Sequence, residues 1–119
     1  MAGGSQLSVT EHRQSNRYPV NRRFIGEHRR RGDIELHLAN VSNYGFMTIS
    51  ATGLSRGERV LIRLPHIGRI EAHLIWTLHE RAGFQFERII RRDDFALMVE
   101  ALQPDQRQRP DGQGVMEYR

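Results

Sequence analysis

The chain has 119 residues, no cysteine and a formal net charge of +4. The absence of cysteine excludes disulfides, thiolate nucleophiles and Cys-ligated metals. All 18 of the Lys and Arg positions are arginine, so lysine Schiff bases are excluded as well. The length suggests one domain, and no uncharged run approaches the roughly 20 residues of a membrane helix. Since residues 1–10 also lack the pattern of a signal peptide, we expect a cytoplasmic protein without membrane insertion.

The positive charge is concentrated near the N-terminus. Residues 1–31 hold seven arginines against two glutamates, whereas the remaining residues hold 11 arginines against 12 acids. A local positive field attracts anions such as nucleotides, nucleic acid or acidic lipid. A solvated basic face without a dedicated partner gives the same pattern, so charge alone does not identify a ligand.

Three regions follow one another along the chain. Residues 1–11 are small and polar, and we expect a flexible N-terminal arm there. Residues 12–102 carry the periodic apolar pattern of a folded domain. Residues 103–119 contain two Pro, two Gly and almost nothing to bury, so we expect a disordered C-terminal tail.

Apolar and polar residues alternate along four segments, as in half-buried antiparallel strands. These segments are residues 34–39, 60–64, 70–78 and 84–86. In the third segment the alternation predicts that Leu74, Trp76 and Leu78 face inward. Because short strands with one apolar face must bury it on one another, we predict an all-β fold, a small six- or seven-stranded antiparallel barrel.

The periodicity changes near the C-terminus. Apolar residues recur at i, i+3, i+4 and i+7 from Phe95 to Leu102, the spacing of an amphipathic helix. Asp93 and Asp94 are N-cap candidates, and Pro104 would stop the helix. We therefore predict one C-terminal α-helix packed against the barrel.

Several patterns typical of enzymes occur without the context that they need. Residues 53–57 spell the G-x-S-x-G of a nucleophile elbow, but a strand pattern follows where that motif requires a helix. The histidines include no i, i+4 pair of a helical zinc site, although His37 and His73, expected on adjacent strands, would be able to meet. The carboxylates of the strand segments fall on outward or turn positions. We expect no catalytic residues, no metal and no enzymatic activity.

One ordered pair of motifs remains. Residues 13–17 (RQSNR) read R-x-x-x-R, and residues 40–45 (NVSNYG) read N-x-S-x-x-G at the end of a predicted strand. Together they resemble the signature of the PilZ domain, the receptor module for bis-(3′–5′)-cyclic dimeric GMP (cyclic di-GMP). The order of the later strands and the closing helix is also similar to that family over residues 12–102.

The resemblance implies a cyclic di-GMP site that consists of Arg13, Arg17, Asn40, Ser42 and Gly45. The two arginines would bind guanine edges and phosphates, which a guanidinium matches with paired hydrogen bonds. Asn40 and Ser42 would hydrogen-bond the other guanine, and Gly45 would allow either a close backbone approach or a positive φ. Asparagine stands at residue 40 where the family often has aspartate, which removes one charge-assisted contact. A turn without a ligand would also use such residues.

The resemblance further implies a non-enzymatic receptor without a cofactor. Its N-terminal arm would change conformation on binding and regulate an unidentified protein partner in motility, biofilm or polysaccharide output. Two alternatives stay open: a PilZ-like adaptor that acts through protein contacts without the dinucleotide, and a basic small-barrel protein that binds nucleic acid. Nucleic acid is disfavoured because residues 12–31 offer only Tyr18 and Phe24 as stacking platforms.

Overall fold

The computed structural model describes residues 17–50 and 52–103. The predicted N-terminal arm, Arg13 and nearly all of the predicted C-terminal tail lie outside these ranges. Every statement about structure below concerns the described residues.

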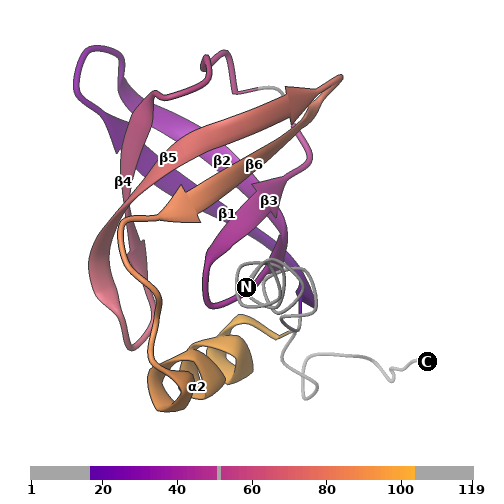
Figure 1. Ribbon diagram of the computed structural model, residues 1–119, viewed down its shortest axis with the longest axis vertical. Helices are drawn as coiled ribbons and strands as arrows, with labels where there is room; N and C mark the ends of the chain where they lie inside the picture. Colours follow the sequence, from indigo (N-terminus) through magenta and orange to yellow (C-terminus); the bar gives the residue numbers. More distant parts are fainter. Residues whose placement is uncertain (1–16, 51, 104–119) are drawn as a thin grey trace, which may run out of the picture.

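Six antiparallel strands form a closed barrel (Figure 1). They are β1 (Tyr18–His28), β2 (Gly32–Val41), β3 (Gly45–Thr48), β4 (Arg59–Leu64), β5 (Gly68–Leu78) and β6 (Arg81–Phe86). Their order around the barrel is β1-β2-β3-β6-β5-β4, and the pair Glu27 and Leu61 joins β4 back to β1. The predicted small all-β barrel is confirmed.

The apolar side of each alternating strand fills the barrel. On β4 the buried residues are Val60, Ile62 and Leu64. The same alternation is buried as predicted at Leu36 and Leu38 of β2, at Ile70, Ala72 and Leu74 of β5, and at Phe84 and Phe86 of β6. Phe46 of β3 stacks on Phe84 of β6 with ring centroids 4.8 Å apart. These aromatic and aliphatic side chains form one core, because each strand has only one apolar face to bury.

The predicted alternation is wrong at the end of β5. Leu74 pairs with Phe84 and Trp76 pairs with Gly83, so Ile75 is an extra residue in β5 without a counterpart in β6. Such a bulge moves the following side chains to the opposite face. Trp76 is therefore 39% exposed and Leu78 62% exposed, on the outside of the barrel.

The first strand was not among the predicted segments. Its inward positions include Val20, Phe24 and Gly26, but the exposed Arg22 interrupts them. The pairing register with β2 shifts between Pro19 and Arg22. A strict period of two is lost at such an irregularity, which hides the strand from a sequence pattern.

The helix α2 (Arg92–Leu102) covers one end of the barrel, next to the start of β1 (Figure 1). Met98 and Leu102 are buried, and the Phe95 ring lies 5.6 Å from that of Tyr18. The predicted helix is present, but the N-cap is Arg91, which makes no side-chain cap. Asp93 and Asp94 lie two and three residues after this cap, inside the first turn, where carboxylates interact favourably with the helix dipole.

Candidate ligand-binding site

The motif of residues 40–45 forms the end of β2, a tight turn and the start of β3. The N–H of Ser42 donates to the Gly45 carbonyl at 2.8 Å, and the N–H of Tyr44 donates to Ser42 Oγ at 3.1 Å. Ser42 is buried. Its hydroxyl oxygen thus accepts a turn hydrogen bond, which leaves its own O–H to donate elsewhere.

The same turn is anchored to the last residue of β6 and to the segment between β6 and α2. The N–H of Phe86 donates to the Tyr44 carbonyl at 2.8 Å, and the N–H of Ile90 donates to the Asn43 carbonyl at 2.9 Å. Since these bonds connect the turn to β6 and to the segment leading into α2, its shape is fixed before any ligand arrives.

Gly45 allows two strands to approach closely. It pairs with Gln85 of β6, and a Cβ at residue 45 would overlap the carbonyl oxygen of Phe84. Its φ is not positive, unlike that of Gly32, Gly53, Gly57 and Gly68. Of the two reasons expected for a glycine here, the close approach is the one that the structure has.

Arg17 connects the first motif to the second. Its Nη1 donates to Asn40 Oδ1 at 3.3 Å, and Asn40 in turn contacts the sulfur of Met47. Arg17 is exposed and forms no ion pair with any residue of the described ranges. Its positive charge therefore remains available to an anion.

Trp76 adds an aromatic surface beside this turn, and sequence reasoning missed it. The indole lies against Gly83, since a Cβ at residue 83 would overlap the ring. The bulge at Ile75 cannot be read from periodicity, so the only sequence signal is Gly83, a residue without a side chain directly before Phe84 of β6.

The Trp76 indole and the turn at residues 42–45 border a small cavity of about 60 Å³. It is lined by Arg17, Ser42, Tyr44, Gly45, Phe46, Met47, Ile75, Trp76, Gly83, Phe84 and Gln85.

The chemistry of this site suits a flat anionic ligand. A guanidinium offers paired donors to phosphate or to a guanine edge, and an indole offers a stacking face. The Ser42 hydroxyl and the Asn40 amide supply neutral hydrogen bonds. The site thus combines positive charge, aromatic area and polar groups within one shallow surface.

The two histidines that were expected on adjacent strands are not neighbours. His37 lies on β2 and His73 on β5, and the barrel order separates these strands. His37 Nε2 lies 2.5 Å from Asn21 Oδ1 instead. Within residues 17–50 and 52–103, no group of three or more His, Asp or Glu is placed to hold a metal ion.

No protein-family model matches the chain, and no curated protein matches it significantly. Among the helices of the described ranges, none has the length and apolar character needed to cross a membrane.

Proposed function

We propose that the protein is a PilZ-type receptor that binds cyclic di-GMP at the surface formed by Arg17, Asn40, Ser42 and Trp76. One observation carries this proposal: Arg17 and Asn40 lie 23 residues apart in sequence, yet their side chains are hydrogen-bonded. Each belongs to one of the two motifs. The last residue of the first motif is thus joined to the first residue of the second motif, beside an exposed indole.

The chemistry of the ligand matches the residues present. Cyclic di-GMP carries two phosphates and two guanines, and each guanine has N7 and O6 acceptors on one edge and N–H donors on the other. The Arg17 guanidinium fits a phosphate or the N7/O6 edge, and Asn40 Oδ1 can accept from guanine N–H groups. Stacking of a base on Trp76 would add about 1–3 kcal/mol.

The size of the cavity suggests how such a receptor would signal. Enclosed ligand pockets usually exceed about 300 Å³, and this cavity has about 60 Å³. A dinucleotide would therefore lie on the barrel surface, and the chain preceding Arg17, including Arg13, would close over it. That rearrangement of the N-terminal arm would change the surface offered to a protein partner. We place this non-enzymatic receptor in the cytoplasm, with a partner in motility, biofilm or polysaccharide output.

Isothermal titration of the full chain with cyclic di-GMP tests the proposal. Arg17→Ala removes charge-assisted hydrogen bonds of about 1.5–3 kcal/mol each, so its affinity should fall at least tenfold while its melting temperature stays nearly unchanged. Arg63→Ala is the matched control, because Arg63 is also exposed and also follows another arginine by four residues. No binding by the wild-type chain would favour the adaptor alternative. Equal affinity of Arg17→Ala and wild type would reject this surface.

A further inference from the structure

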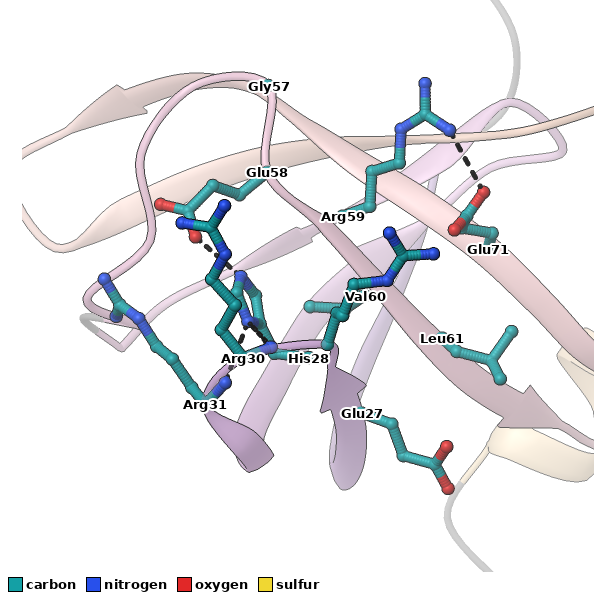
Figure 2. Close-up of a pocket in the computed structure, with 11 residues that line it drawn as sticks. Glu27, His28, Arg30, Arg31, Gly57, Glu58, Arg59, Val60, Leu61 and Glu71 are labelled. Carbon is teal, nitrogen blue, oxygen red and sulfur yellow. Dashed lines mark hydrogen bonds and ion pairs between the residues drawn. The ribbon is translucent and has the colours of Figure 1, made fainter.

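A second, larger cleft lies beside the β1–β2 turn, at the end of the barrel opposite α2 (Figure 1). Figure 2 shows the side chains that line it. Its volume is about 900 Å³, and it lies between the β1–β2 turn and the start of β4. Strands β1 and β4 pair only at Glu27 and Leu61. Beyond that pair, β1 ends at His28 and turns back into β2, where His28 pairs with Gly32. The start of β4 therefore has no β1 partner, and the seam is open there.

His28 fixes the turn that carries Arg29, Arg30 and Arg31. Its side chain is only 8% exposed, and its Nδ1 accepts the backbone N–H groups of Arg30 and Arg31, both at 3.1 Å. Since Nδ1 accepts, the ring proton is on Nε2 and donates to Glu58 Oε1 at 2.6 Å. Arg31 is further held by a bond from Nη1 to the Gly53 carbonyl at 2.5 Å. The arginine turn is thus preorganised rather than loose.

The acidic groups of the cleft already have partners or point away from the turn. Glu58 accepts from His28 and from the N–H of Ser55 at 2.7 Å. Glu71 is paired with Arg59, and Glu27 points away from the arginine turn (Figure 2). Arg29 and Arg30 are both exposed, and neither forms an ion pair within the part of the chain that the structure describes.

We infer that this cleft is a second anion site, which binds phosphate groups through the guanidiniums of Arg29 and Arg30. Guanidinium forks match phosphate oxygens geometrically as well as electrostatically. The volume also falls in the range of pockets that hold small molecules, so a phosphate with an attached group fits. A free phosphorylated metabolite and a phospholipid headgroup present this same chemistry. The inference is independent of the proposed dinucleotide site, which lies at the other end of β1.

The test titrates inorganic pyrophosphate into the full chain near physiological ionic strength, where loosely associated surface charges are largely screened. Arg29→Gln with Arg30→Gln should weaken binding at least tenfold. The matched control is Arg63→Gln with Arg69→Gln, which removes two exposed arginines that face each other across β4 and β5. That control should bind pyrophosphate like wild type.

Co-sedimentation with vesicles of phosphatidylcholine and phosphatidylglycerol distinguishes the two sources of phosphate. Pyrophosphate binding that needs Arg29 and Arg30 supports a free phosphorylated ligand, and vesicle binding that needs them supports a lipid headgroup. Equal weakening of both double variants, or no binding to either probe, would overturn the inference. The Arg29→Gln, Arg30→Gln variant should keep its melting temperature and any affinity for cyclic di-GMP, so the failure of one site would not be mistaken for failure of the other.

Discussion

Leu74 and Trp76 lie two residues apart on β5 but on opposite sides of the barrel wall. Leu74 is fully buried, whereas Trp76 is 39% exposed. Leu74→Ala should lower the free energy of unfolding by about 2–5 kcal/mol, because it leaves a cavity in the core. Trp76→Ala should cost less, on the order of 1–2 kcal/mol, since no internal cavity forms. Urea denaturation followed by circular dichroism measures both, and a Trp76→Ala loss as large as that of Leu74→Ala would contradict the bulged register.

Glu58 gives the stability a defined pH dependence. The backbone N–H of Ser55, and then the His28 side chain, hold the pKa of the Glu58 carboxyl below its ordinary value of 4.5. A carboxyl with a lowered pKa in the folded state stabilises the fold fully above its unfolded pKa, and this contribution is lost as the pH falls through the folded pKa.

Glu58→Gln should therefore destabilise the protein at neutral pH, and the difference from wild type should shrink as the pH falls below 4.5. Urea denaturation at a series of pH values measures this difference. Glu80→Gln at the exposed β5–β6 turn is the control and should change little throughout. A Glu58→Gln difference that stays constant across the series would show that the ionised carboxylate is not the stabilising group.

Within the strands, Gly45 on β3 and Gly83 on β6 should respond differently to substitution by alanine. A Cβ at Gly45 meets the backbone carbonyl of Phe84, whereas a Cβ at Gly83 meets the Trp76 indole. Backbone within a paired sheet cannot move aside, so Gly45→Ala should destabilise by about 1–3 kcal/mol or more. The exposed indole can rotate, so Gly83→Ala should cost less stability but should weaken cyclic di-GMP binding. Thermal melts and calorimetry separate the two effects, and an unchanged affinity of Gly83→Ala would remove Trp76 from the site.

Regular strands could be predicted from the sequence, and irregular ones could not. The alternation of Val60, Ile62 and Leu64 follows directly from one buried face, and the structure confirms it. The bulge at Ile75 adds one residue whose neighbours keep an apolar pattern, so the sequence places Trp76 on the wrong face. The helix was predictable from its spacing, but its start was not, because two aspartates suit the first turn as well as the cap.

At the scale of the whole molecule, the basic N-terminal region divides into two separate surfaces. Arg17 precedes β1 and Arg29 follows it. At about 3.3 Å per residue, an 11-residue strand separates its ends by roughly 35 Å. Composition shows one cluster of positive charge, whereas the extended strand carries Arg17 to the α2 end of the barrel and Arg29 to Arg31 to the other. The motif residues of the candidate site were predictable from the sequence, but Trp76 was not. Trp76 lies in the site only because the bulged pairing of β5 with β6 turns it to the outside of the barrel.

We propose that cyclic di-GMP binds beside Trp76, which is the only tryptophan of the chain. A fluorescence titration of Trp76, excited at wavelengths that guanine does not absorb, tests it most directly, because a base stacked on the indole quenches its emission. We predict saturable quenching by cyclic di-GMP in the wild-type chain and in Arg63→Ala, with at least tenfold more ligand required in Arg17→Ala. Emission that stays unchanged at high ligand concentration, or quenching that is the same in Arg17→Ala as in wild type, would contradict the account.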